Sequence, residues 1–316
     1  MVGCSTVARE LILTFILFFA GLAGLLIGGE LLIRGAVGLA QRFHVPPLVI
    51  GLTILGFGTS TPELLVSLEA ALSGSPALAL GNVVGSNIAN ILLILGLSSL
   101  IVPMQLDFPR LRREFMVMIG ATIVLWLMLG GGVVARPEGM LLLAGLAAYL
   151  WLSLKGAREI PENPVACRPL WQSAIMALGG LVVLMGGAKA MVFSASEIAR
   201  MLGVSEAVIG LTIVAVGTSL PELVASIMAA MRKHPELAIG NILGSNIFNI
   251  LGILGVTATV TPVPVDPRFS AFDVGLALTA ALAFLALAAL PGRVGRIAGG
   301  GLLASYGGYL ALLGLG

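Results

Sequence analysis

The chain has few charged residues. Lys and Arg number 17 and Asp and Glu 15 among 316 residues, so 10% of the chain is charged, against about 25% in typical soluble domains. Hydrophobic residues make up 58%. This shortage of charge excludes an ordinary soluble domain and predicts an all-α polytopic membrane protein whose surroundings are a lipid bilayer. The net charge of +2 does not indicate a nucleic-acid partner.

Cysteine and histidine are also scarce. Cys4 and Cys167 form no spacing pattern, so no disulfide framework is expected. His44 and His234 lie near predicted span ends, which disfavours a transition-metal site. The motifs H-E-x-x-H and G-x-x-x-x-G-K-[ST] are absent from the sequence, which disfavours an intramembrane metalloenzyme and a nucleotide-driven pump. The chain is therefore predicted not to be an enzyme and to hold no organic cofactor.

Long apolar runs fill most of the chain. The first run has no small-residue cleavage site, so it is predicted to be a retained span rather than a signal peptide. Apolar windows of about 20 residues, separated by charges or turn residues, indicate membrane helices. They predict ten transmembrane helices, at residues 11–41, 47–72, 77–100, 114–132, 138–155, 170–200, 206–231, 235–260, 272–290 and 295–314.

The charges between these spans predict the orientation of the chain. With ten spans both termini lie on one side, which holds four Lys and Arg residues, whereas the other side holds twelve. Positive charge favours the cytoplasmic side. Both termini are therefore expected outside the cytoplasmic (inner) membrane, and the linker 157–169 inside. This linker would separate a first five-helix repeat, 1–156, from a second, 170–316.

An internal duplication relates the two halves. At an offset of 159 residues, Ile50–Ser67 matches Ile209–Ser226 at 12 of 18 positions, and Ala79–Gly96 matches Ala238–Gly255 at 13 of 18. Five spans separate a residue from its copy, and because five is odd the two copies must cross the membrane in opposite directions. Inverted repeats of this kind are typical of secondary transporters, which bind their substrate near the middle of the membrane. The sequence therefore predicts two inverted-topology five-helix repeats.

The duplicated hexapeptides, GTSTPE at 58–63 and GTSLPE at 217–222, interrupt apolar runs. Pro62 and Pro221 cannot donate to the carbonyl four residues earlier, so each is predicted to break its helix. Freed carbonyls are tolerated in lipid only where they line a cavity or meet an ion. The hexapeptides also carry hydroxyls and a carboxylate three or four residues apart, on one helical face: Thr59, Ser60 and Glu63 in the first copy, and Thr218, Ser219 and Glu222 in the second.

The helix after each hexapeptide carries further oxygen-bearing side chains at every fourth residue. These are Asn82, Ser86 and Asn90 in the first repeat and Asn241, Ser245 and Asn249 in the second. Gly240 and Gly244 form an adjacent seam of small residues that permits close helix packing. Together these groups predict a cage of hard oxygen ligands, which suit calcium and, by the same logic, sodium. Two carboxylates without a basic residue in either motif imply a cationic partner or protonation.

The paired motifs GTSxPE and GNxxGSNIxNI resemble the alpha repeats of the cation/calcium exchanger superfamily, in particular its sodium/calcium exchanger branch. The resemblance implies an antiporter that exchanges calcium for sodium by alternating access. By the resemblance, Glu63 and Glu222 are the central ligands of calcium and sodium ions, which are transported substrates. It also implies further ligands: the hydroxyls of Thr59, Ser60, Ser86, Thr218, Ser219 and Ser245, the carbonyls of Gly56 and Ala215, and the side chains of Asn90 and Asn249.

Several alternatives stay open. A calcium/proton exchanger or a potassium-dependent sodium/calcium exchanger is the alternative function, and a monomer is compatible with the sequence. The resemblance implies that the long spans 11–41 and 170–200 slide during transport, and their glycines would permit either sliding or static packing. Helix-to-helix hydrogen bonding and ion contact are equal alternatives for Asn87 and Asn246. Glu30 and Arg34, four residues apart, predict a local ion pair, and Asp273 is expected in a loop.

Overall fold

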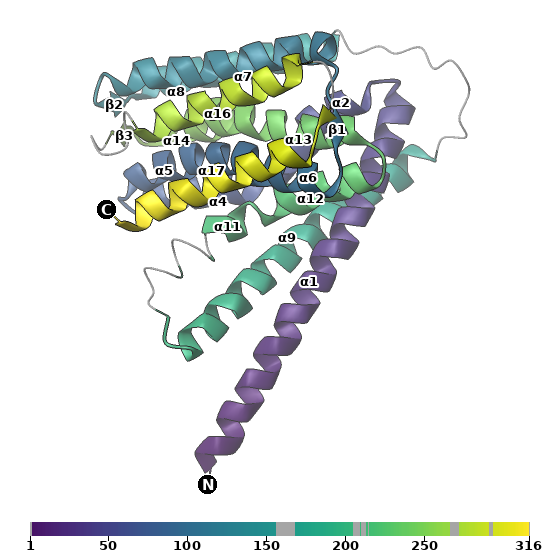
Figure 1. The fold of residues 1–316 in the computed structure, drawn as a ribbon. Coiled ribbons are helices and arrows are strands. Elements are labelled where there is room, and N and C mark those ends of the chain that lie inside the picture. The colour runs from purple at the N-terminus through teal and green to yellow at the C-terminus, as the bar shows by residue number, and fades with distance from the viewer. Residues whose placement is uncertain are drawn as a thin grey trace.

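The protein is nearly all helical in the computed structural model, which describes residues 2–155, 168–204, 209, 213, 215–265, 272–290 and 293–315 (Figure 1). The linker predicted at 157–169 therefore lies almost entirely outside the described residues. In the first half the elements are α1 (Val2–Phe43), α2 (Pro47–Ile50), the π-helical turn η1 (Gly51–Leu55), α3 (Gly56–Thr59), α4 (Thr61–Leu72), α5 (Pro76–Ala89), the π-helical turn η2 (Asn90–Leu95), α6 (Gly96–Ile101), β1 (Met104–Gln105), α7 (Phe108–Leu129), β2 (Val133–Val134) and α8 (Arg136–Lys155).

The second half repeats this order. Its elements are α9 (Leu170–Met201), α11 (Ala215–Thr218), α12 (Leu220–Met231), α13 (Pro235–Phe248), the π-helical turn η4 (Asn249–Leu254), α14 (Gly255–Val260), β3 (Val263–Pro264), α16 (Phe272–Ala289), β4 (Arg293–Val294) and α17 (Arg296–Leu315).

Several helices can cross a membrane by length and composition. Within the described residues six continuous helical segments qualify: Leu11–Phe43, Pro76–Ile101, Arg136–Lys155, Leu170–Met201, Pro235–Val260 and Phe272–Ala289. The pair Pro47–Thr59 and Thr61–Leu72 qualifies as one bent span. Helices α7, α12 and α17 occupy the other predicted intervals. The chain is thus a multi-pass membrane protein.

The turns between paired helices show why the helices end where they do. Proline stands at the first position of α5 and of α13, where its missing N–H costs no helical hydrogen bond. The turn before each uses one residue with positive φ, Gly74 at 82° and its equivalent Lys233 at 63°. Glycine adopts this conformation without a steric penalty. The turns before α5 and α13 therefore have the same backbone conformation at this position.

Two short antiparallel strand pairs join the halves of the chain. Strand β1 pairs with β4, with Met104 opposite Val294, and β2 pairs with β3, with Val134 opposite Val263. Each pair contains one strand from each half, so the two halves are joined by main-chain hydrogen bonds at two places.

Helices α1 and α9 are the two long helices that lie together at one side of the bundle (Figure 1). They cross through glycines: a Cβ on Gly28 would lie 2.4 Å from the Leu184 nitrogen, and a Cβ on Gly180 would lie 2.4 Å from the Leu32 nitrogen. Of the glycines in α9, only some face α1, because a Cβ on Gly179 would meet no described atom within 4 Å. Static close packing is therefore one use of these glycines in this conformation.

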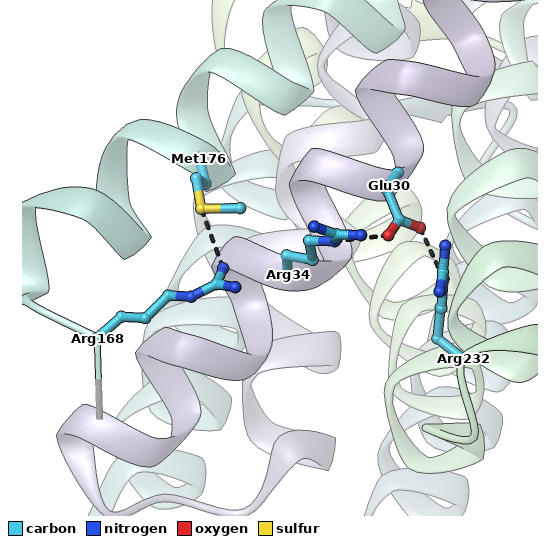
Figure 2. A network of polar contacts seen from close by, with 5 residues as sticks. All are labelled: Glu30, Arg34, Arg168, Met176 and Arg232. Carbon is cyan, nitrogen blue, oxygen red and sulfur yellow. Dashed lines mark hydrogen bonds and ion pairs between the residues drawn. The ribbon is translucent and has the colours of Figure 1, made fainter. Parts of the chain in front are cut away.

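A polar network ties α1 to the turn after α12 (Figure 2). The predicted ion pair between Glu30 and Arg34 is confirmed at 2.6 Å, and the second Glu30 oxygen accepts from Arg232 Nε at 2.7 Å. Figure 2 shows both guanidinium groups directed at the Glu30 carboxylate, whereas Arg168 lies apart, against Met176 of α9. The sequence did not predict the contact with Arg232, which lies 202 residues away.

The prediction that Asp273 lies in a loop is wrong. Asp273 is the second residue of α16, is 7% exposed and accepts a hydrogen bond from the Tyr309 hydroxyl of α17 at 3.1 Å. A carboxylate is favourable in the first turn of a helix because the N-terminal end carries partial positive charge. The helix therefore begins before the aspartate instead of after it.

The adjacent glycines of α9 provide a matched test of the packing against α1. Gly180→Ala should destabilise the protein by about 1–3 kcal/mol, because its Cβ would overlap the α1 backbone. Gly179→Ala should leave stability unchanged or raise it, since alanine is the better helix former. Thermal unfolding of the detergent-solubilised protein measures both. Equal melting temperatures for the two variants would contradict this packing.

Candidate functional site

The first hexapeptide forms a break between two helices. Helix α3 ends at Thr59, α4 begins at Thr61, and the two helical segments meet at an angle of 42°. Ser60 at the break has φ −84° and ψ 9°, and Pro62 is the second residue of α4. Proline is tolerated in the first turn of a helix, where no N–H is required. The break turns Thr59, Ser60 and Glu63 into the interior, where each is at most 1% exposed.

The second hexapeptide has the same local geometry. Helix α11 ends at Thr218, and Ser219 at the break has φ −88° and ψ 6°. Pro221 is the second residue of α12, and Glu222 follows in its first turn. Ser219 and Glu222 are each 2% exposed. Thus both halves present a hydroxyl and a carboxylate from the start of a new helix.

Hydrogen bonds connect the two halves of the chain at the hexapeptides and next to them. Ser60 Oγ donates to Glu222 Oε1 at 2.8 Å, although the two residues are 162 positions apart. Ser245 Oγ donates to the Gly56 carbonyl at 3.3 Å. The structure therefore brings predicted ligand residues of the two halves into one buried cluster.

No basic side chain of the described residues compensates the charge of the two carboxylates. Neither oxygen of Glu63 has a hydrogen-bond partner among the described residues, and Glu222 Oε2 has none either. Nor does any basic side chain of the described ranges form an ion pair with them. Burying an ionised carboxylate without a partner is very unfavourable. This arrangement is therefore suited to holding a cation or a proton between the two acids.

Two further buried amides begin π-helical turns. Asn90 is the first residue of η2 and Asn249 the first residue of η4, and each is 1% exposed. The described residues provide no partner for either polar atom of Asn90 or for Asn249 Oδ1. Short π-helical segments are frequent at functional sites. Both amides can therefore offer an oxygen to an ion.

The other predicted ligand residues are mostly shielded from solvent or lie at the start of a helix. Ser86 and Ser245 are 7% and 0% exposed, Thr218 is half-buried, and Ala215 begins α11. No group of three or more His, Cys, Asp or Glu that could hold a metal is found among the described residues. The cluster is thus built mainly from hydroxyl, amide and main-chain oxygens around two acids.

Asn87 and Asn246, for which the sequence left two alternatives, make hydrogen bonds between and within helices. Asn87 Nδ2 donates to the Asn246 carbonyl at 3.2 Å, and Asn87 Oδ1 accepts from Asn249 Nδ2 at 3.0 Å. Asn246 Nδ2 donates to the Ile242 carbonyl of its own helix at 2.7 Å. Asn87 therefore orients Asn249, so that the Asn249 oxygen is left available.

The glycine seam of α13 allows the halves to approach this closely. A Cβ on Gly240 would lie 2.6 Å from the Leu48 carbonyl oxygen, and a Cβ on Gly244 would lie 2.4 Å from that of Leu52. The approach explains how Ser245 reaches Gly56.

A pocket of about 930 Å³ lies elsewhere, next to Pro46, Arg113 and Lys233 among others, and neither Glu63 nor Glu222 lines it.

Known proteins are similar to this chain in both of its halves. The family model described as "Sodium/calcium exchanger protein" matches residues 13–155 and 172–315. Inner membrane protein YrbG of Escherichia coli (strain K12) is 35% identical over 96% of this chain and 97% of its own length. Sodium/calcium exchanger MaX1 of Methanosarcina acetivorans is 28% identical over 95% of this chain and 98% of its own length.

A solved structure is similar over nearly the whole chain. The sodium-calcium exchanger NCX_Mj, soaked with zero Na+ and Ca2+, matches with a TM-score of 0.85 and 33% identity, covering 96% of this chain and 99% of that chain.

Ser60 and Thr61 provide a test of the cluster. Ser60→Ala removes a predicted ligand hydroxyl that also holds Glu222, and we expect cation binding to weaken about tenfold or more, since loss of a group that orients a ligand alone commonly costs that much. Thr61→Ala should leave binding unchanged, because the Thr61 hydroxyl donates to the Phe57 carbonyl of its own chain segment. The rise in melting temperature with added calcium measures both. Equal weakening in the two variants would contradict this assignment.

Proposed function

The chain belongs to the sodium/calcium exchanger family, and we propose that it exchanges calcium for sodium across the membrane by alternating access. The observation that carries this proposal is the pair of buried glutamates, one from each half, that meet at a cluster of hydroxyls without a basic partner among the described residues. A site of this charge binds cations, and a membrane protein that binds them between two related halves can expose them to either side.

The proposed ligands are oxygen atoms from both halves. Glu63 and Glu222 supply the charge, and hydroxyls, amides and carbonyls complete the shell: Thr59, Ser60, Ser86, Asn90 and Gly56 from the first half, and Thr218, Ser219, Ser245, Asn249 and Ala215 from the second. Calcium takes about six to eight oxygen ligands, so the set is large enough. The hard oxygens and the scarcity of histidine and cysteine favour calcium and sodium over transition metals.

Competition for the two carboxylates explains exchange. One calcium ion neutralises both glutamates, and two sodium ions carry the same charge. Because an empty pair of buried carboxylates is unfavourable, the site releases one kind of cation most readily when the other replaces it. Exchange of calcium for sodium follows from this competition.

The architecture that we propose is ten transmembrane helices in two inverted five-helix repeats, 1–156 and 170–316, joined by the linker 157–169. Support comes from the match of one family model to both halves and from the equivalent order of elements in each half. Strand pairs that each combine one strand from either half give further support.

We propose that the protein lies in the cytoplasmic membrane with both termini outside and acts as a monomer. The excess of Lys and Arg in the loops on the opposite side supports this orientation. The E. coli relative is named an inner membrane protein. Helices α1 and α9 would move relative to the remaining helices to open the site to each side in turn.

Transport by purified protein tests the proposal. Sodium-loaded proteoliposomes diluted into sodium-free buffer should take up radioactive calcium, and Glu63→Gln or Glu222→Gln should reduce this uptake to background. Glu69→Gln is the matched control, because Glu69 is exposed on the same helix as Glu63; its uptake should equal that of the unaltered protein.

Parallel vesicles separate the alternatives. Uptake driven by a proton gradient without sodium would assign the protein to calcium/proton exchange. Uptake that needs potassium as well as sodium would indicate a potassium-dependent exchanger. No calcium uptake under any gradient would overturn the proposed substrate.

A further inference from the structure

We propose that Asn82 and Asn241 are positioning residues, which hold the two glutamate-bearing helices in a fixed orientation and do not bind the transported ion. This inference rests on the proposed function of the Glu63 and Glu222 site. It differs from the expectation drawn from the sequence, in which both asparagines belonged to the oxygen cage with the serines one turn further along.

Each amide group donates to the neighbouring glutamate helix in the same way. Asn82 Nδ2 donates to the Glu63 carbonyl at 3.1 Å and to Ser67 Oγ at 2.9 Å. In the second half, the Asn241 Nδ2 group donates to the Glu222 carbonyl at 3.2 Å and to Ser226 Oγ at 3.0 Å. An amide nitrogen has two hydrogens, so both are used by the helix that carries the glutamate.

The two contacts fix the rotation of that helix about its axis. Glu63 and Ser67 are four residues apart in α4, and Glu222 and Ser226 are four apart in α12, so each pair lies on one face over consecutive turns. One hydrogen bond would leave the helix free to turn, whereas two bonds one turn apart oppose rotation. The direction of the glutamate Cβ is set by this rotation, so each asparagine controls where a carboxylate points.

Asn241 has an additional role at the other half of the site. Its Oδ1 lies 3.2 Å from Thr59 Oγ1, which also lies 2.9 Å from the Leu55 carbonyl oxygen. A hydroxyl has one hydrogen, and both neighbours are acceptors. The single Thr59 hydrogen can therefore bond to only one acceptor at a time, and the oxygen lone pairs of Thr59 stay available for a cation.

Asn82 and Asn241 differ from the asparagines that we propose as ligands. Atoms of Asn90 and Asn249 are buried without partners among the described residues, whereas no side-chain atom of Asn82 or Asn241 is in that state. Because the amide nitrogens of Asn82 and Asn241 face a glutamate carbonyl, the amide oxygens of the same side chains point away from that carbonyl. The amide nitrogens of Asn82 and Asn241 are thus used within the protein, whereas the two asparagines that we propose as ligands keep buried atoms without a partner among the described residues.

Substitution by aspartate distinguishes a support from a ligand. Aspartate keeps the oxygen of Asn241 but loses both N–H groups, and its charge would repel the Glu222 carbonyl. We therefore expect Asn241→Asp and Asn241→Ala to weaken calcium binding to a similar extent, about tenfold or more. Substitution of a residue that holds a metal ligand commonly has an effect of this size. If Asn241 were an ion ligand, the added negative charge would preserve or strengthen calcium binding in the aspartate variant.

The measurement is the calcium concentration that gives half of the maximal rise in melting temperature of the detergent-solubilised protein, for Asn82 and Asn241 variants. Ser226→Ala, which removes one of two acceptors, should weaken binding less than Asn241→Ala. Asn82 is half-buried while Asn241 is 0% exposed, so Asn82→Ala and Asn82→Asp provide the test if the Asn241 variants do not fold.

The outcomes are distinct. Calcium binding by an aspartate variant that equals or exceeds that of the unaltered protein would overturn the inference, and so would unchanged binding in the alanine variants. If neither calcium nor sodium stabilises the unaltered protein, the proposed function fails instead, before any variant is compared.

Discussion

Two carboxylates that are buried close together, with no basic partner among the described residues, are the constraint on which the structure depends. A charged side chain in the middle of a membrane costs about 2.5–3.5 kcal/mol by insertion scales, and Glu63 and Glu222 are 1% and 2% exposed. Stability and function are therefore linked, because any ion that neutralises the pair also stabilises the fold. Hydroxyls, amides and helix breaks around the pair place oxygen atoms in an interior whose buried side chains are mostly apolar.

The meeting of the two glutamates depends on how the halves interlock. In the helical segment Pro235–Val260, 94% of the most apolar 18-residue stretch is buried inside the protein. The second half therefore contributes the centre of the bundle. Its glycines allow the broken helix of the first half to cross within contact distance of the main chain. A larger side chain at Gly244 would separate the segments that carry Ser245 and Gly56, and the hydrogen bond between these residues would be lost.

Local features of the site could be predicted from the sequence because they depend on neighbouring residues. Pro62 removes a helical hydrogen bond wherever the segment lies, and four-residue spacing places Glu63 and Ser67 on one face in any helix. Contacts between distant segments could not be predicted in this way. The bond from Ser60 to Glu222 depends on the depth at which two helices cross, and no local pattern specifies that depth. The same spacing that placed Asn82 on a polar face did not specify which way its amide points.

Differences between the halves show that this conformation is not symmetric. Asn241 is completely buried and its equivalent Asn82 is only half-buried, although both make the same two hydrogen bonds. Glu30 pairs with Arg232, whereas the equivalent positions are Lys189 and Ser73, which cannot form an ion pair. Two halves with the same conformation would surround a site equally exposed to both sides of the membrane. The halves instead adopt unequal arrangements here, and the ion pair at Glu30 favours this one, because the equivalent positions in the other half cannot form it.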